Sequence, residues 1–111
     1  MWHDLHTLYN KKKISVIVEK AFSNEVLRLL EESGVGGYTI YPEISGKGKH
    51  GARNGHTEFA SGILGNVEIV TIVSEQTADH ILEKLAEIVE SGVVIVVHVI
   101  DVQVMRKDYF A

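Results

Sequence analysis

The tetrapeptide Glu32-Ser33-Gly34-Val35 occurs again as Glu90-Ser91-Gly92-Val93, and these two stretches decide the fold. Each follows a run in which apolar residues recur every three or four positions, which is the spacing of one helix face. A glycine directly after such a run is a common helix stop, because glycine adopts left-handed backbone angles without strain. The chain therefore contains two helices that end in the same way.

The first of these helices is flanked by two predicted strands. Alternating β-branched residues predict a strand over 13–19, and a second strand is predicted over 37–42. Between them, Ser23 or Asn24 is expected to cap a helix that ends at Gly34. The apolar stripe of this helix consists of Phe22, Val26, Leu29 and Leu30.

The second half repeats this order. Residues 67–73 alternate as a strand, and residues 75–90 have the apolar spacing of an amphipathic helix. The nearly unbroken apolar run over 93–99 predicts a strand buried on both faces, and 102–105 predicts a short edge strand.

Two consecutive β-α-β units predict an α+β fold, the ferredoxin-like double unit, with an antiparallel sheet and both helices on one face. Ile17 and Ile72 alternate out of phase with the other apolar residues of their strands, so the helix-free face is also apolar. An apolar face of this kind is typical of a subunit contact. We therefore expect an oligomer.

A long loop joins the two halves. Residues 43–66 are rich in glycine and lack an apolar period. A loop of this length in a small domain is typical of a functional segment. The 111 residues suffice for one domain only, and we expect a tail over 1–12 and this loop over 43–66 within it.

The charge distribution favours a small anion as ligand. The net charge is −4, which argues against a nucleic-acid partner. Within 46–56, however, Lys47, Lys49 and Arg53 occur without any acid, so this stretch carries +3 and the rest of the chain −7. The chain has no cysteine, no signal-like leader and no apolar run long enough to span a membrane, and we expect a cytoplasmic protein.

Several short motifs resemble those of the PII signal-transduction family. The stretch 34–40 is similar to the second-strand motif of that family, and Gly55-His56-Thr57-Glu58 matches the tetrapeptide of its long T-loop. Gly62 keeps a further glycine of the family, and the resemblance extends over about residues 12–107. The order and spacing of the motifs make the match more specific than any one of them.

The resemblance implies a homotrimer that binds an adenine nucleotide in clefts between its subunits and signals through T-loops that dock on partner proteins. It implies that the nucleotide contacts come from Ile17, Thr39, Gly46, Lys47, Gly48, Lys49, Ile72 and Arg106.

Several positions depart from the family pattern. Gly92 leads directly into Val93, so the phosphate-gripping loop after the second helix is missing, and Val104 replaces the first of two arginines. These departures favour ADP or AMP over ATP. The glutamine and the lysine that hold 2-oxoglutarate are replaced, the first by His50 and the second by the turn Gly65-Asn66.

Such losses resemble the PII-like branch that is linked to inorganic-carbon uptake and carboxysome operons. For this branch the implied ligands are ADP, AMP and bicarbonate, and the implied partner is a bicarbonate transporter or a carboxysome-related protein. Lys49, His50 and Arg53 are the candidate bicarbonate contacts.

Two other functional classes were weighed. An enzyme needs acids, bases or nucleophiles on rigid elements, whereas His56 and Glu58 belong to the loop, so we expect no catalysis and no catalytic residue. No histidine and carboxylate spacing indicates a metal site. The alternative is a protein like the divalent-cation-tolerance family, a metal-binding or structural trimer, but the long glycine-rich loop argues against it.

Overall fold

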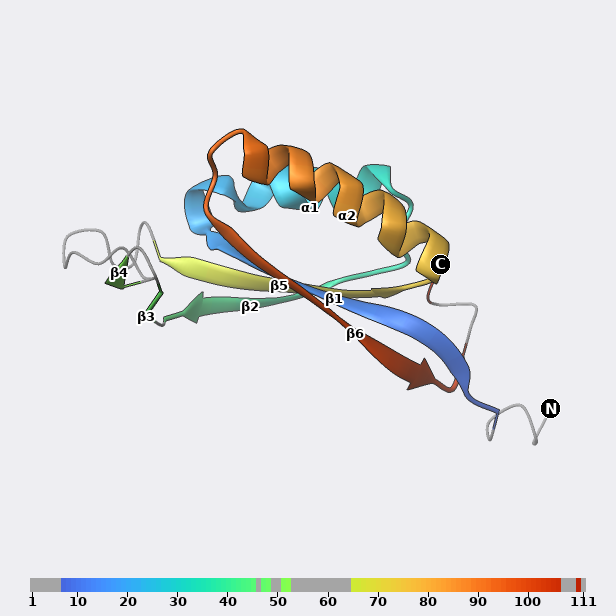
Figure 1. Ribbon diagram of the computed structural model, residues 1–111. Coiled ribbons are helices and arrows are strands. Elements are labelled where there is room, and N and C mark those ends of the chain that lie inside the picture. Colours follow the sequence, from blue (N-terminus) through green and yellow to red (C-terminus); the bar gives the residue numbers. More distant parts are fainter. Residues whose placement is uncertain (1–6, 46, 49–50, 53–64, 107–109, 111) are drawn as a thin grey trace.

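The computed structural model describes residues 7–45, 47–48, 51–52, 65–106 and 110. Its main sheet is antiparallel, with the strand order β2-β5-β1-β6, and the helices α1 and α2 both lie on one face of it (Figure 1). This arrangement confirms the ferredoxin-like α+β prediction. The elements are β1 (Tyr9–Glu19), α1 (Ser23–Glu32), β2 (Thr39–Ile44), β5 (Asn66–Val73), α2 (Glu75–Glu90) and β6 (Ile95–Val104).

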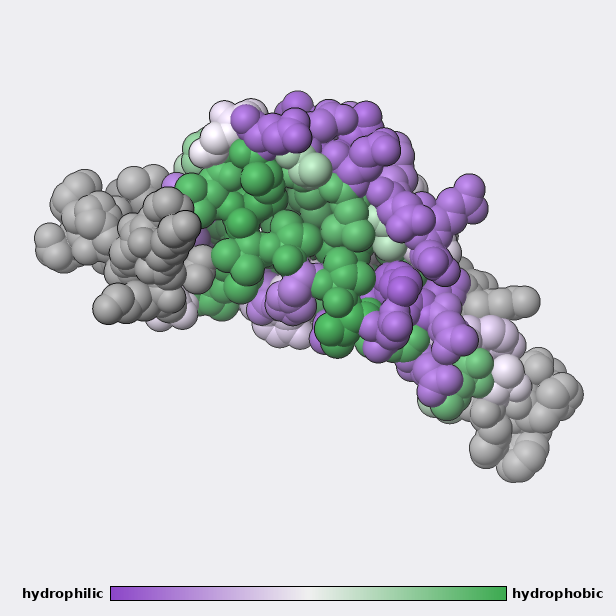
Figure 2. Space-filling model, in the orientation of Figure 1, coloured by the Kyte–Doolittle hydropathy of each residue, from purple (hydrophilic) through white to green (hydrophobic). Residues whose placement is uncertain are grey.

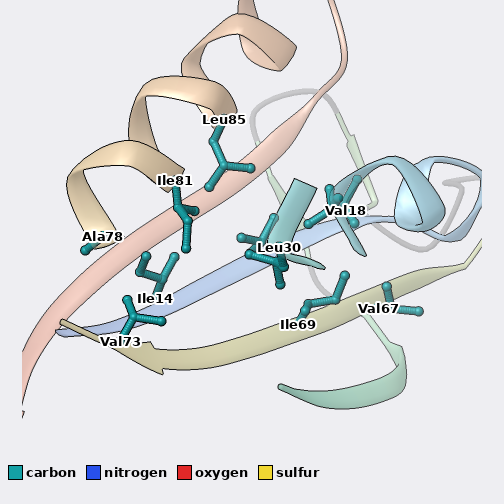
Figure 3. Close-up of a cluster of buried hydrophobic side chains, with 11 residues drawn as sticks. Ile14, Val18, Leu30, Val67, Ile69, Val73, Ala78, Ile81 and Leu85 are labelled. Atoms are coloured by element: carbon teal, nitrogen blue, oxygen red, sulfur yellow. The ribbon is translucent and has the colours of Figure 1, made fainter. Parts of the chain in front are cut away.

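The hydrophobic core lies between the sheet and the two helices (Figure 3). Every second residue of β1 and β5 points to this side, and α1 and α2 cover it with the apolar stripes that their sequences predict. The buried hydrophobic side chains are Ile14, Val16, Val18, Val26, Leu30, Val67, Ile69, Val73, Ala78, Ile81 and Leu85.

Both helices end at the glycines that the repeated tetrapeptides predict. Gly34 and Gly92 have φ angles of +79° and +104°, which a residue with a side chain adopts only with strain. The preceding serines donate their hydroxyls to helix carbonyls, Ser33 to Leu29 at 2.7 Å and Ser91 to Ile88 at 2.6 Å. The two halves thus share one helix stop.

The helix starts differ from each other. Ser74 caps α2 and accepts a hydrogen bond from the amide of Thr77 at 3.2 Å. The prediction of Ser23 or Asn24 as the cap of α1 is wrong, because the 3₁₀ turn η2 (Lys20–Phe22) precedes α1 and Phe22 occupies the cap position. Ser23 instead donates its hydroxyl to the carbonyl of Lys20 at 2.8 Å, so it closes that turn.

The strand ends differ from the sequence predictions. β1 begins at Tyr9, four residues earlier than expected, because it pairs with β6 as far as Tyr9–Val104. It therefore takes in part of the segment predicted as a tail. The strands expected over 93–99 and 102–105 are one strand, β6, at the edge of the sheet, where its residues alternate between half-buried and exposed. The expectation that this strand is buried on both faces is wrong for the single chain.

The long loop is not wholly irregular. β3 (Lys47–Gly48) pairs with β4 (Gly51–Ala52) inside it, and β2 continues to Ile44 beyond a register shift. Glu43 at this shift has a φ of +56°, an uncommon angle for a residue with a side chain. Of the segment 43–66, residues 46, 49–50 and 53–64 lie outside the described residues.

Candidate functional site

The helix-free face of the sheet, here called the bare face, carries three of the predicted site residues. Strand alternation and the pairing register place side chains of all four strands on it. They include Lys13, Ser15, Ile17, Thr39, Tyr41, Asn66, Glu68, Val70, Ile72, Val96, His98 and Ile100.

Much of the bare face is apolar and accessible in the single chain. Val96 is 37% exposed, Ile100 50% and Tyr41 52%, values that contrast with the fully buried core of the other face. Figure 2, which views the β6 edge of the sheet, shows hydrophobic surface along β6 and between β6 and the hydrophilic outer surface of α2. Contiguous apolar surface of this kind is typical of a protein contact or a ligand cleft.

Three predicted nucleotide contacts lie on this face, on three different strands. Ile17 pairs with Glu68, Thr39 with Val70, and Ile72 with Lys13. The positions of Ile17 and Ile72 are four residues apart along β5, or roughly 13 Å at the rise of a strand. One chain therefore brings Thr39 near the middle of the face but leaves Ile17 and Ile72 toward its two ends.

The other predicted contacts come from outside the main sheet or outside the described residues. Lys47 and Gly48 form β3, and Arg106 follows the end of β6 and is exposed. The remaining nucleotide and anion positions are Gly46, Lys49, His50 and Arg53, and with the loop motif Gly55, His56, Thr57 and Glu58 they all lie outside the described residues.

Hydrogen bonds fix the segment before β2, the C-terminal end of the loop and the middle of the bare face. Thr71 donates its hydroxyl to the carbonyl of Gly37 at 2.7 Å, which anchors the segment before β2. The amide of Lys20 donates to the carbonyl of Gly65 at 2.7 Å, which anchors the segment before β5. On the bare face, Ser15 donates its hydroxyl to the carboxylate of Glu68 at 2.5 Å.

Sequence reasoning assigned no role to Asn66, the first residue of β5. Its side chain is 3% exposed, and its amide nitrogen has no hydrogen-bond partner. An asparagine that follows a glycine is typical of a turn, so no local pattern indicates a buried strand residue here.

A charged hollow lies beside the first turn of α2, away from the predicted contacts. It has a volume of about 300 Å³ and is lined by Asn10, Lys11, Lys12, Glu75 and Asp101. Lys12 donates to Asp101 at 2.5 Å, and this bond together with the charge of Asp101 raises the pKa of Lys12 above its ordinary value of 10.5. Within the described residues, no three histidine or acidic side chains are grouped so as to hold a metal ion.

The fold and these positions define a class: a ferredoxin-like domain whose predicted ligand contacts lie on its helix-free face and on a long loop between β2 and β5 of its main sheet. Comparison with known proteins then identifies the family. Residues 11–109 match the family described as nitrogen regulatory protein P-II, and the chain belongs to this family. No protein with curated annotation matches the chain significantly.

The chain is similar to solved structures of CPII, a nitrogen regulatory PII-like protein from Thiomonas intermedia K12. The form bound to ADP, AMP and bicarbonate is 36% identical with a TM-score of 0.84, over 94% of this chain and 96% of that one. The form bound to ADP and bicarbonate is 35% identical with a TM-score of 0.82, over 95% and 98% of the two chains. The apo form is 31% identical with a TM-score of 0.70, over 88% and 95%.

These similarities confirm the resemblance to the PII family and its PII-like branch, and they favour it over the divalent-cation-tolerance alternative. In the described residues, neither helix is both long and apolar enough to cross a membrane.

Proposed function

We propose that this chain is a cytoplasmic regulatory protein that binds AMP or ADP, with bicarbonate as a second ligand, between the subunits of a homotrimer. The observation that carries the proposal is the 36% identity, over 94% of this chain, to a CPII structure bound to ADP, AMP and bicarbonate. The coverage extends across the sheet, both helices and the loop-bearing segment, so the likeness is not confined to a common core.

The bare face supports assembly. Apolar surface left in water costs roughly 25 cal/mol for each Å², and Val96 and Ile100 are 37% and 50% exposed in the single chain. A closed ring of subunits covers this face on every copy. Three chains of 12.3 kDa would give a particle of about 37 kDa.

The separation of the predicted contacts supports a cleft shared between subunits. Ile17 and Ile72 are roughly 13 Å apart along the sheet, further than one adenine ring extends. In our proposal, each cleft takes some contacts from the bare face of one chain and others from its neighbour. Thr39, Lys47, Gly48 and Arg106 are the further contacts in described parts of the chain, and Gly46 and Lys49 complete the set.

The short connection between α2 and β6 supports a preference for AMP or ADP over ATP. α2 ends at Glu90 and β6 begins at Ile95, so only four residues connect them. Such a connection offers few backbone amides for outer phosphates, and Val104 offers no charge-assisted bond to them.

We propose that Lys49, His50 and Arg53 contact bicarbonate, because the stretch 46–56 carries a charge of +3 on an otherwise acidic chain. The loop over 43–66, with its motif 55–58, would then carry the signal to a bicarbonate transporter or a carboxysome-related protein. Nucleotide and bicarbonate that use the same form of the loop should tighten each other's binding by the same factor.

Calorimetric titration of the full chain tests this function. AMP, ADP and ATP are titrated separately, each with and without saturating bicarbonate. We expect AMP or ADP to bind at least as tightly as ATP, and bicarbonate to tighten nucleotide binding. Binding of none of the three nucleotides, or a preference for ATP of tenfold or more, would overturn the proposal.

A further inference from the structure

The amide nitrogen of Asn66 is a buried donor without an acceptor. The residue is 3% exposed, and Nδ2 makes no hydrogen bond. A buried N–H group that has lost water and gained no partner destabilises the folded chain. Folded proteins keep few such groups, and each calls for a physical reason.

The position of Asn66 connects this donor with the bare face. Asn66 is the first residue of β5, and it pairs with Ile44 of β2 and with Glu19 of β1. Strand alternation places its side chain on the same side as Glu68 and Ile72. The unsatisfied donor therefore lies on the proposed ligand face, where the loop rejoins the sheet.

The acceptors nearest in register do not satisfy it. Glu19 lies directly opposite on β1, but its carboxylate does not accept from Nδ2. The carboxylate of Glu68 accepts from Ser15, which pairs with Val70, so it leans away from Asn66. Strand pairing with Glu19 and Ile44 holds the backbone of Asn66 in place. Neither Glu19 nor Glu68 accepts a hydrogen bond from its amide nitrogen.

We propose that Nδ2 of Asn66 donates a hydrogen bond to an anionic oxygen of the bound ligand. This inference rests on the proposed function, because it adds a residue to that site. An anion is favoured because the stretch with Lys47, Lys49 and Arg53 belongs to the loop that joins the sheet here, and hydrogen bonds to charged acceptors are the strong ones. Bicarbonate and a nucleotide phosphate are two sources of the same acceptor chemistry.

The proposal makes stability and affinity change in opposite directions. Leucine has the same heavy-atom branching as asparagine but no donor, so Asn66→Leu removes the unsatisfied group from the empty protein. We expect the variant to have a higher melting temperature than the wild type without ligand, and at least tenfold weaker binding of the anion. A structural asparagine would behave otherwise, because losing a satisfied hydrogen bond lowers the melting temperature.

The experiment measures thermal unfolding without ligand and calorimetric Kd values for AMP alone and for bicarbonate in the presence of AMP. Asn66→Asp is the second variant, because it also removes the donor and adds a negative charge. It should weaken binding of the anion at least as much as Asn66→Leu does. Asn10→Leu is the matched control on β1, where Asn10 accepts from Gln103 at 3.3 Å. It should leave both Kd values unchanged and should not raise the melting temperature.

Loss of bicarbonate binding alone assigns the acceptor to bicarbonate, and loss of AMP binding assigns it to the nucleotide. A wild-type chain that binds both ligands, with Asn66→Leu binding them equally well, would overturn this inference and leave the proposed function standing. A wild-type chain that binds neither would overturn both.

Discussion

The two faces of the sheet are built from the same strands and nearly the same residue types, yet they do different work. On the helix-covered face, Ile14, Val16 and Ile69 are at most 1% exposed. On the bare face, Val96 and Ile100 are 37% and 50% exposed. Because strand residues alternate between the faces, each strand places one half of its residues in the core and the other half on the face that we propose as the contact and ligand surface.

Their polar groups differ in the same way. Thr71 on the covered face is buried, and its hydroxyl donates to the carbonyl of Gly37, so this buried polar group has a hydrogen-bond partner. Asn66 at the end of the bare face is equally buried, and its amide nitrogen has no partner. Ser15 on the bare face is buried too, but it donates to Glu68, so Asn66 is distinguished by its unsatisfied donor and not by its burial.

The largest effect should come from the covered face. Ile69→Ala removes a side chain that is 1% exposed, and a large-to-small change in a core costs about 2–5 kcal/mol. Ile72→Ala is the matched variant, three residues further along β5 and on the bare face. Urea unfolding at several protein concentrations should show a large loss of unfolding free energy for Ile69→Ala at every concentration. For Ile72→Ala the loss of unfolding free energy should be smaller and should depend on protein concentration. Equal losses in the two variants would contradict the difference between the two faces.

A charge on the bare face should act on assembly and leave folding intact. Ile100→Asp places a carboxylate in an apolar contact, at a cost on the order of 2 kcal/mol for each subunit. Light scattering should show the mass falling from about 37 kDa toward the single chain of 12.3 kDa. Val89→Asp, at an apolar position of α2 that is 49% exposed, is the control and should keep the larger mass. A wild type that is already a monomer would contradict the proposed trimer.

The sequence predicted the frame of the fold because its signals are local. The alternation in 13–19, the apolar stripe of 75–90 and the stops at Gly34 and Gly92 all appear in the structure. Where the sequence analysis failed, the deciding interaction was remote. β1 starts early because it pairs with Val104 at the far end of the chain, and β6 is half exposed because no strand follows it in the sheet.

The candidate site was predictable only in part, and for a related reason. Ile17 and Ile72 stood out because their apolar side chains are out of phase with the core, and both lie on the bare face. Asn66 gave no such sign, because its burial depends on three strands that meet only after folding. Contacts between copies of the chain leave no local pattern either, and so the cleft itself stays a prediction.

A third prediction separates the two proposed ligands. Arg106→Ala would remove the proposed charge-assisted bond to the nucleotide, and because such a bond contributes roughly 1.5–3 kcal/mol, AMP should bind about tenfold more weakly or worse. Arg53→Ala should instead weaken the binding of bicarbonate more than the binding of AMP. Calorimetry measures the Kd of AMP and of bicarbonate for both variants, and each variant is the other's control because each loses one arginine. If both variants weakened the two ligands equally, the arginines would act only through the overall positive charge and not through specific contacts.

The smallest effect concerns the pair Lys12–Asp101, beside the first turn of α2. Asp101 raises the pKa of Lys12 above 10.5, so the folded chain holds this proton more tightly than the unfolded chain does. The stabilisation is therefore complete below about pH 10.5 and is lost as the pH rises through the folded-state pKa. The partner is largely exposed, with 83% of the Asp101 side chain accessible, so water and salt screen the pair.

Asp101→Asn should accordingly lower the melting temperature slightly at pH 8, and this difference should shrink as the pH rises above 10.5 and also in high salt. Glu83→Gln, which removes one acid from the exposed surface of α2, is the control for the change in net charge. A difference for Asp101→Asn that does not shrink as the pH rises further above 10.5 would show that the aspartate acts through the backbone or the packing of β6. The charge of Lys12 would then have no part in holding β6 to β1.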